Sequence, residues 1–390
     1  MNSGQYVFAQ AVLLLPSRVF DRCVKVFNGN KGVRHFTCWH QFMCMVFGQL
    51  SNRESLRDLI VCINAHKPKH YHLGLGKHVS RSTLADANER RDYRIYETFA
   101  YELISQAQQL VVKDQELASI TAGNVYALDS TIIDLCLNSF WWATFRKAKA
   151  AVKVHTLLDL KTSIPAFVQI TPASVHDLHE LDRINLEPGG FYIMDRGYID
   201  FKRLDKIDRH DAFFVIRSRD KLGFKRISSK TVIKSSGVLC DQIIELTNFY
   251  PKSFYSKKLR RIKFYDQQQN RTFVFLTNNL ELAASDIALL YKYRWRIELL
   301  FKWIKQHLKI KTFWGRSINA VKTQIYIAII TYVLVIILKS KLKLTQSIYE
   351  IIQIIGMSLV DKTPIRDLFD NTENQDIKEL NNIQLKINLI

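Results

Sequence analysis

The sequence predicts a mixed α/β protein with helical regions on both sides of a β-rich centre. Helical apolar periodicity runs to about residue 115, short strand-like runs begin after Asn124, and helical patterns return after about residue 281. Three strands in succession, followed by strands that alternate with helices, indicate a mixed sheet and exclude a helical bundle. The 390 residues are enough for two or three domains.

Five apolar runs form the expected core strands, and the turn-like segment 160–163 joins the second run to the third as a hairpin. The runs are Val125–Ile133, Lys153–Asp159, Pro165–Thr171, Phe191–Met194 and Ala212–Ile216. Branched and aromatic residues favour strands, and the polar segments between the runs favour turns.

The chain is strongly basic, with 56 Lys and Arg against 36 Asp and Glu and a net charge of +20. Between Arg217 and Phe264, 13 Lys and Arg face 3 Asp and Glu, which is half of the whole excess. Short strand-like runs share this segment, so we expect a basic β-rich insertion over residues 217–280. It could neutralise the phosphates of a nucleic acid, and the alternative is a solvated charged face.

The amino-terminal region, residues 1–115, is expected to be helical and to bind DNA. A turn leads into a helical pattern over Val79–Arg91 that opens with Ser80, Arg81 and Ser82. This arrangement is compatible with a helix-turn-helix, and an ordinary surface helix fits it equally well.

The sequence predicts a cytoplasmic, nucleoid-associated protein that does not enter a membrane. Its six cysteines show no C-x-x-C pair, which is typical of reduced thiols, and its amino terminus does not resemble a secretory signal. The apolar run Ile325–Leu338 has 14 residues, whereas a membrane span needs about 20. We therefore expect a buried core helix there.

Two aspartates stand where an isolated carboxylate is costly. Asp129 lies inside the first strand-like run, and Asp195 directly follows the fourth. A buried carboxylate needs a partner or a metal ion, and two-metal cleavage of phosphodiesters needs carboxylates from separate elements. Asp159 and Asp177 lie beside turn signals, where aspartate has local roles. His155 is expected to have at most a supporting role.

A third acid lies on an amphipathic helix. Tyr291, Arg294, Glu298 and Lys305 fall at offsets of 0, 3, 7 and 14, which places them within an arc of about 60° on an α-helix. The opposite face of this helix is apolar. A carboxylate flanked by a tyrosine, an arginine and a lysine suits metal-dependent chemistry on a phosphate backbone.

These residues carry a resemblance to a known family. The segments Asp129-Ser-Thr131 and Asp195-Arg-Gly-Tyr198, with the pattern Y-x2-R-x3-E-x6-K, resemble the DDE transposases of bacterial insertion sequences, in particular the IS-four group. The resemblance covers about residues 120–340, and residues 35–60 resemble a helical region often attached to these enzymes. It implies a ribonuclease-H-like catalytic core (120–216 and 281–340), interrupted by the insertion and followed by a helical tail (341–390).

The resemblance also implies the site. Asp129, Asp195 and Glu298 would be the catalytic residues and would hold two Mg²⁺ ions, with Mn²⁺ as a substitute. Trp295 and Trp303 flank the helix and could stack on a displaced base.

The three neighbours of the glutamate, Tyr291, Arg294 and Lys305, would bind DNA phosphates. Family members cut the transposon ends, often through a hairpin, and join the 3′ hydroxyl to target DNA. The expected partners are therefore double-stranded DNA, as terminal inverted repeats and target, and a second copy of the chain in a homodimer. Two alternatives are a related nuclease or resolvase that cuts without joining, and a non-catalytic DNA-binding repressor.

Overall fold

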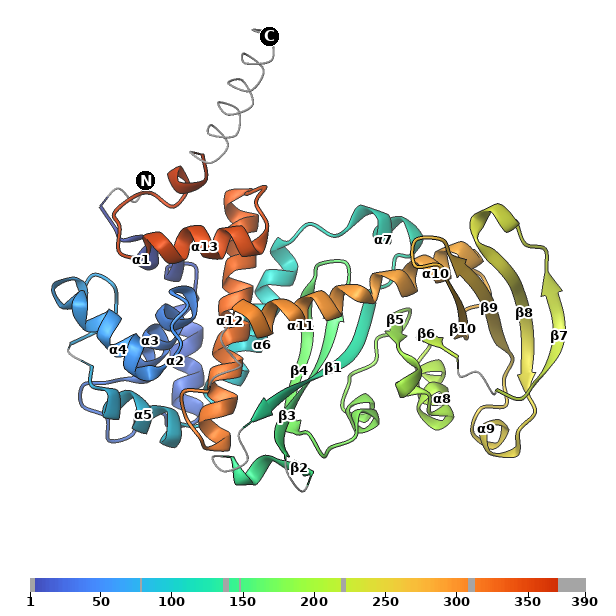
Figure 1. The fold of residues 1–390 in the computed structure, drawn as a ribbon, viewed down its shortest axis with the longest axis horizontal. Helices are drawn as coiled ribbons and strands as arrows, with labels where there is room; N and C mark the ends of the chain where they lie inside the picture. The colour runs from blue at the N-terminus through green and yellow to red at the C-terminus, as the bar shows by residue number, and fades with distance from the viewer. Residues whose placement is uncertain are drawn as a thin grey trace, which may run out of the picture. The chain divides into compact units, whose positions relative to one another are not determined.

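The computed structural model describes residues 4–77, 79–135, 140–146, 149–218, 222–307 and 313–370. The chain forms two compact units, whose segments can be followed by the residue-number colours of Figure 1. The helical unit comprises Met1–Val111 and Lys302–Ile390, and the sheet unit comprises Val112–Phe301. This division differs from the predicted one, which assigns residues 302–340 to the catalytic core. Of the predicted carboxyl-terminal tail, residues 371–390 lie outside the described residues.

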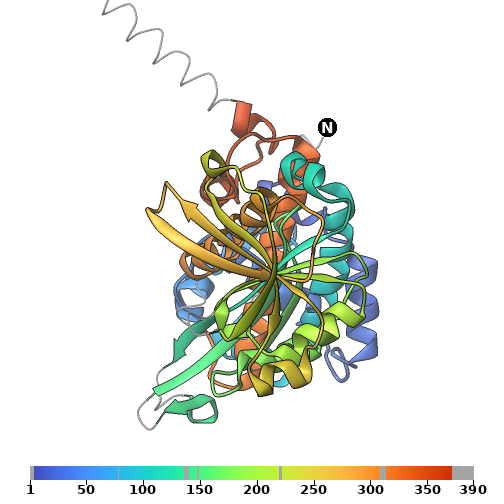
Figure 2. The same cartoon turned by 90° about the vertical axis from the view of Figure 1, so that its right-hand side faces the viewer.

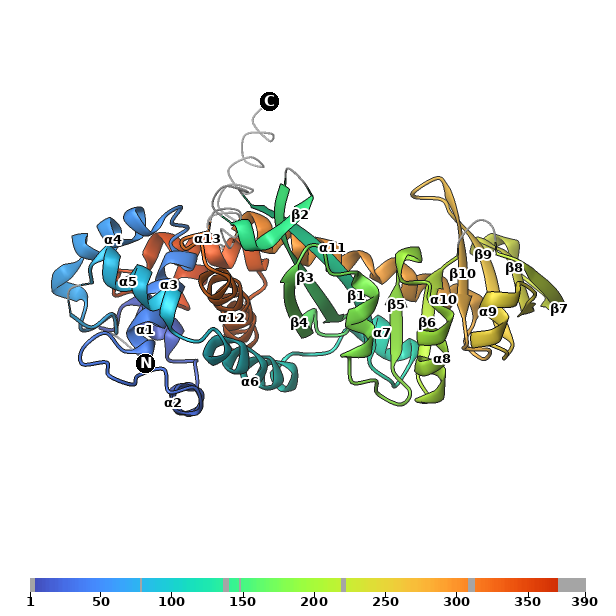
Figure 3. The same cartoon turned by 90° about the horizontal axis from the view of Figure 1, so that it is seen from below.

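The helical unit is built around one long buried helix. Its main helices are α1 (Val7–Val12), α2 (Ser17–Val26), α3 (Cys38–Leu50), α4 (Leu56–Ala65), α5 (Arg81–Arg90), α6 (Arg94–Leu110), α12 (Ile318–Leu342) and α13 (Ile348–Ser358). The last helices are coloured orange and red in Figure 3.

Helix α12 is apolar on all sides, so it needs neighbours all round. It contacts α3, α6 and α13, which explains why it belongs to the helical unit. It is long and apolar enough to cross a membrane, but 94% of its most apolar window is buried inside the protein. The prediction of a buried core helix over Ile325–Leu338 is confirmed.

The expected helix after Val79 is present as α5, and Ser80 caps it by accepting a hydrogen bond of 3.1 Å from the Thr83 N–H. The preceding helix, α4, ends at Ala65, so 15 residues (66–80) separate the two. A helix-turn-helix has a turn of about 3–4 residues. These two helices therefore lack that spacing, and DNA binding by this region stays a prediction.

The sheet unit holds one sheet, whose strands twist progressively in the view of Figure 2. Its strand order is β2-β3-β1-β5-β6-β10-β9-β8-β7, with β4 paired to β3. The strands are β1 (Val125–Leu135), β2 (Thr144–Arg146), β3 (Lys149–Asp159), β4 (Ile164–Pro172), β5 (Phe191–Met194), β6 (Phe213–Arg217), β7 (Phe224–Lys230), β8 (Val238–Leu246), β9 (Leu259–Asp266) and β10 (Arg271–Thr277). The helices are α7 (Gln115–Ile120), α8 (Phe201–Arg209), α9 (Phe249–Phe254), α10 (Ala284–Tyr293) and α11 (Trp295–His307), whose last residues pass the unit boundary.

All five predicted core strands form. Strands β1, β3 and β4 are an antiparallel meander, and β5 and β6 add to β1 in parallel. A meander followed by two parallel strands is the ribonuclease-H-like arrangement that the resemblance implies. Every residue of β5 is buried, as expected for a central parallel strand.

The predicted β-rich insertion extends this same sheet. Strand β10 pairs antiparallel with β6, and β9, β8 and β7 follow in order. Leu128 and Phe214 of the core share one apolar cluster with Ile244, Leu259 and Leu276 of the insertion. The insertion is therefore part of the same folded body, because its apolar residues are buried against the core.

The basic residues of the insertion have two different environments. Lys225, Arg226 and Lys230 are exposed on the edge strand β7. Arg260 is buried and binds Asp241 through two hydrogen bonds, of 2.8 and 2.7 Å. Only part of the excess positive charge is therefore available to a ligand.

We expect Asp241→Ala to lower the free energy of unfolding by about 3–5 kcal/mol, because it leaves the Arg260 guanidinium buried without its partner. Chemical denaturation measures this loss. Glu102→Gln is the control: Glu102 pairs with Arg22 on the surface, and its loss should cost less than about 1 kcal/mol. Equal losses in the two variants would contradict a structural role for the buried pair.

Candidate active site

The ends of two neighbouring strands bring Asp129 and Asp195 together. Strands β1 and β5 run parallel, and their last paired residues are Leu128 and Met194. Asp129 is the next residue of β1, and Asp195 is the first residue after β5. Because paired parallel strands lie about 4.8 Å apart, both aspartates emerge at the same place on the sheet.

Two side chains from the helical segment reach these aspartates. The Tyr291 hydroxyl donates to Asp195 Oδ1 at 3.2 Å. Arg294 Nη1 donates to Asp129 Oδ2 at 3.0 Å, and its Nη2 donates to Glu298 Oε1. The structure therefore brings all three predicted acids to one site, with Tyr291 and Arg294 as the direct links.

Burial controls the protonation of the site. Burial raises the pKa of Tyr291 to about 12, so its hydroxyl keeps its proton and can donate. The pKa of Asp129 is also raised, mainly by burial. Repulsion from Glu298 and Asp195 adds to this rise, whereas Arg294 and the Ser130 N–H oppose it. The site thus concentrates negative charge that a cation stabilises.

The predicted continuous helix is interrupted at Arg294. Helix α10 ends at Tyr293 and α11 begins at Trp295. The Arg294 N–H bonds to the carbonyl of Tyr291, and the Ile297 N–H bonds to that of Arg294, both at 3.1 Å. These are i to i−3 bonds, so the chain tightens for one turn at the residue that contacts two acids.

Of the three other predicted residues, Lys305 and Trp303 lie away from the acids, whereas Trp295 lies beside Glu298. Lys305 is on α11, seven residues or about 10 Å beyond Glu298, and belongs to the helical unit. The ring of Trp303 packs on Tyr332 with centroids 4.6 Å apart, so it is a core residue. Trp295 is 58% exposed and remains available for stacking.

Comparison with known proteins identifies the family. Residues 121–334 match the family described as the transposase DDE domain. The chain is also 33% identical over 287 residues to y4zB of Sinorhizobium fredii (strain NGR234), which is named as a transposase. That match covers 72% of this chain and 78% of y4zB. The chain belongs to the DDE transposase family.

Other relatives are named for insertion sequences. The chain is 30% identical over 214 residues to a transposase named for IS5377 of Geobacillus stearothermophilus, covering 53% of this chain and 54% of that protein. It is 26% identical over 269 residues to a transposase named for IS4SA of Synechocystis, and that match covers 66% of this chain and 72% of that protein.

Among solved structures, a piggyBac transposase synaptic complex with hairpin DNA aligns over 95% of this chain and 86% of that chain, with a TM-score of 0.46 and 12% identity.

Membership of the family establishes the predicted class of protein. The chain is a DDE transposase of the insertion-sequence type with a ribonuclease-H-like core, and it acts on DNA. Transposases of this family use divalent metal ions. Residues 3–76 match a separate family, DUF4372, which is described as a domain of unknown function.

The carboxylates of this transposase fit a divalent metal ion by their chemistry. Asp129 and Glu298 supply hard oxygen donors, and Arg294 already places a cation between them. Among the described residues, no three His, Cys, Asp or Glu side chains are grouped closely enough to hold a metal ion. The Arg294 guanidinium lies between two carboxylates that would hold a metal ion, and the two cations would compete for the same oxygens.

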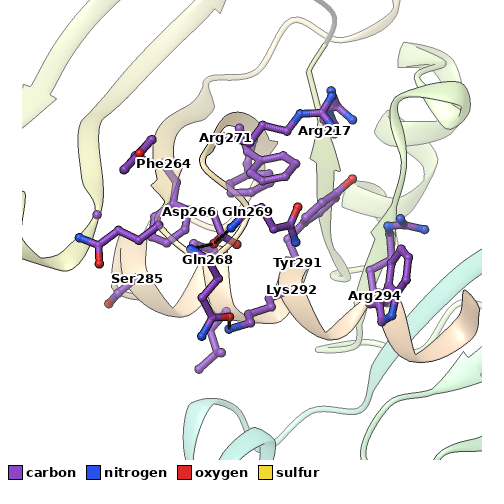
Figure 4. Close-up of a pocket in the computed structure, with 18 of the residues that line it drawn as sticks. Arg217, Phe264, Asp266, Gln268, Gln269, Arg271, Ser285, Tyr291, Lys292 and Arg294 are labelled. Carbon is purple, nitrogen blue, oxygen red and sulfur yellow. Dashed lines mark hydrogen bonds between the residues drawn. The ribbon is translucent and has the colours of Figure 1, made fainter. Parts of the chain in front are cut away.

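A pocket of about 900 Å³ opens beside the acids (Figure 4). It lies between the β9–β10 hairpin and helices α10 and α11, and its lining includes Arg294 and Glu298. Arg217 and Arg271 each stack over Phe273, 5.5 Å from the ring centre. The pocket combines cations with aromatic rings, which suits a nucleotide with its phosphate.

A polar cluster next to Asp129 has more contacts than the sequence suggests. Asp177 Oδ1 accepts a hydrogen bond of 2.7 Å from the Ser130 hydroxyl and lies 3.1 Å from Lys153 Nζ. His155 Nδ1 is 3.4 Å from the same oxygen, and burial lowers the pKa of His155 to about 4. The sequence predicts only a turn role for Asp177, because its partners are distant in the chain.

Asp159 has the local role that the sequence predicts. Asp159 accepts hydrogen bonds from the Lys161 N–H and the Thr162 hydroxyl, which is a local turn role. Asp134 is exposed on β1.

We expect Arg294→Gln to destabilise the protein by about 1–3 kcal/mol at pH 7, because Asp129 and Glu298 lose their shared cation. Arg294 opposes the rise that burial causes in the pKa of Asp129, and its stabilising effect requires the ionised carboxylate. The effect is therefore present above the raised pKa of Asp129 in the folded protein and disappears as the pH falls through it towards the ordinary value, near 3.9. Thermal unfolding between pH 3 and 8 measures the difference.

Competition for the oxygens adds a second expectation: Mn²⁺ should stabilise Arg294→Gln more than it stabilises the wild type. Arg209→Gln, which removes an exposed arginine paired with Asp205, is the control and should show neither effect. If the loss of stability in Arg294→Gln persisted unchanged at pH 3, the electrostatic explanation would be contradicted.

Proposed function

We propose that Asp129, Asp195 and Glu298 are the catalytic triad of this transposase. The observation that supports the proposal is that the pairing of β1 with β5 stops at Leu128 and Met194, so that Asp129 and Asp195 follow at the same register, while Arg294 joins Asp129 to Glu298. Three acids from three separate elements suit metal-dependent cleavage of phosphodiesters.

The triad would hold two Mg²⁺ ions, and Mn²⁺ would substitute. When bound, the ions would supply activation of the attacking oxygen and stabilisation of the leaving oxygen. The protein residues fix the geometry: the Ser130 N–H donates to Asp129 Oδ1 at 2.8 Å, and Tyr291 orients Asp195. These contacts hold the carboxylates before substrate arrives, which reduces reorganisation during the reaction.

Tyr291, Arg294 and Lys305 would bind DNA phosphates. In the unbound protein, Tyr291 and Arg294 contact the acids instead. We infer that Arg294 would leave the acids if a metal ion were bound there, and that its planar guanidinium would then bind a phosphate with two hydrogen bonds. The arginine would thus exchange a carboxylate partner for a phosphate partner.

The DNA would be bound over several surfaces. The exposed cations of β7 would contact the phosphate backbone, and the pocket beside Glu298 would accept a nucleotide displaced near the cut, with Trp295 available for stacking. The amino-terminal helices would bind the terminal inverted repeats. Two copies of the chain would join the transposon ends in the cytoplasm, at the nucleoid.

We expect Glu298→Gln and Asp195→Asn each to lower the rate of DNA cleavage more than about 100-fold. Removing a metal ligand should reduce activity more than removing a residue that only supports a ligand. Cleavage of the cognate ends with Mg²⁺ is the measurement, and inverted repeats identified on both sides of the gene would supply the substrate. Asp134→Asn, on the same strand as Asp129 but exposed, is the control.

A joining assay with labelled 3′ hydroxyl ends distinguishes the related activities. Strand transfer by the wild type supports a transposase that completes the reaction, whereas cleavage alone would indicate a nuclease or resolvase. Retention of strand transfer by Glu298→Gln would exclude the proposed triad.

We expect Lys225→Gln, Arg226→Gln and Lys230→Gln together to weaken DNA binding regardless of sequence. Each lost phosphate contact should reduce the slope of log affinity against log salt by about 0.9. Fluorescence anisotropy at several salt concentrations measures both effects. Lys202→Gln on α8, also exposed, is the control, and an unchanged slope in the triple variant would place the DNA elsewhere.

A further inference from the structure

The segment of β1 that carries Asp129 has a strand on one side only. In the described part of the chain, β1 pairs with β5 as far as Leu128, whereas its pairing with β3 continues to Leu135. Asp129 is therefore the first residue whose backbone lacks the support of a second strand. Such a segment needs another contact to be held rigidly, and a site residue needs rigid support.

Asp177 supplies that contact. Its Oδ1 accepts the Ser130 hydroxyl at 2.7 Å, and Asp177 itself is held by Lys153 Nζ at 3.1 Å. Lys153 Nζ also donates to the carbonyl of Val175 at 2.8 Å, two residues before Asp177. The contact thus joins β1, β3 and the 3₁₀ helix Asp177–Asp182.

Ser130 connects this cluster to the carboxylate of Asp129. Its backbone N–H donates to Asp129 Oδ1 at 2.8 Å, while its side chain donates to Asp177. Successive side chains of a strand point to opposite faces, so Asp177 holds Ser130 from the face opposite Asp129. Fixing the Ser130 side chain fixes the direction of its N–H.

The buried polar groups of this cluster cost free energy that a purely structural contact would not require. Lys153 is 7% exposed and His155 is fully buried, and burying such polar groups is unfavourable. A role in orienting the neighbouring Asp129 accounts for these polar groups.

We propose that Asp177 is a positioning residue that orients the Asp129 carboxylate for metal binding through Ser130. The inference rests on the proposed triad. Asp177 contacts neither DNA nor the reacting atoms; it restricts the Ser130 peptide, and the Ser130 N–H restricts one oxygen of Asp129. The other oxygen, Oδ2, remains with Arg294 in the unbound protein.

The test is Mn²⁺ binding to the full chain without DNA, measured by calorimetry or electron paramagnetic resonance. Residues that support a metal ligand typically change affinity 10- to 100-fold, so we expect Ser130→Ala to weaken Mn²⁺ binding by about that factor. Ser130→Thr keeps the hydroxyl and should restore most of the affinity. Asp177→Ala should match Ser130→Ala, and the double variant should be no weaker than either, because both act through one contact.

Ser130→Ala is the decisive variant, because it keeps the Lys153–Asp177 pair and is expected to fold. Asp177→Ala leaves Lys153 buried without its partner, so its melting temperature must be measured alongside. Asp182→Asn is the matched control: it lies in the same 3₁₀ helix, pairs with Arg203 at 2.7 Å, and should leave Mn²⁺ affinity unchanged.

The outcomes of this test distinguish a failure of the positioning role from a failure of the proposed triad. Wild-type Mn²⁺ affinity in Ser130→Ala, or a double variant weakened by the product of the two single effects, would overturn the positioning role. Asp129→Asn is the reference. If it loses affinity while Ser130→Ala does not, only the positioning role fails, and if Asp129→Asn binds Mn²⁺ normally, the triad itself is wrong.

Discussion

The pairing of β1 with β5 is the constraint on which the site depends. Four residues of β1 pair with four residues of β5, and the pairing of the two strands stops after Leu128 and Met194. Because the pairing is parallel, the next residues of the two strands lie side by side where the pairing stops, and both are aspartates. A change of one residue in this register would move one aspartate to the other face of the sheet. The remaining parts of the site are arranged around this point: Tyr291 on one aspartate, Arg294 on the other, and Glu298 one turn beyond Arg294.

The electrostatics of the site follow from that geometry. Three acids brought together in a partly buried place repel one another, and the protein supplies its own cation where the helical segment tightens at Arg294. The unbound state is thereby stabilised without a metal ion. The same arginine also lines the pocket beside Glu298. The residue that pairs with two of the acids is therefore exposed to the neighbouring pocket as well.

Much of this could be predicted from the sequence, because the relevant signals are local. Strand-like runs located β1, β3, β4, β5 and β6, and the spacing from Tyr291 to Glu298 located the third acid. The break at Arg294 was not predictable, since every residue around it is compatible with a continuous helix. The grouping of α12 with the amino-terminal helices depends on which partners bury it, which periodicity does not specify. The contacts of Asp177 were missed because they join Ser130, Lys153 and Asp177 across 47 residues of chain.

The division of the chain also sets an order for folding. The sheet unit is one continuous segment, 112–301, whereas the helical unit is assembled from residues before 112 and after 301. During synthesis, the apolar faces of α3 and α6 emerge first but cannot be covered until α12 follows, more than 200 residues later. Contacts so distant in sequence form slowly, and uncovered apolar surfaces aggregate or recruit chaperones in the meantime. The sheet unit can therefore complete its fold before the helices that precede it in the chain.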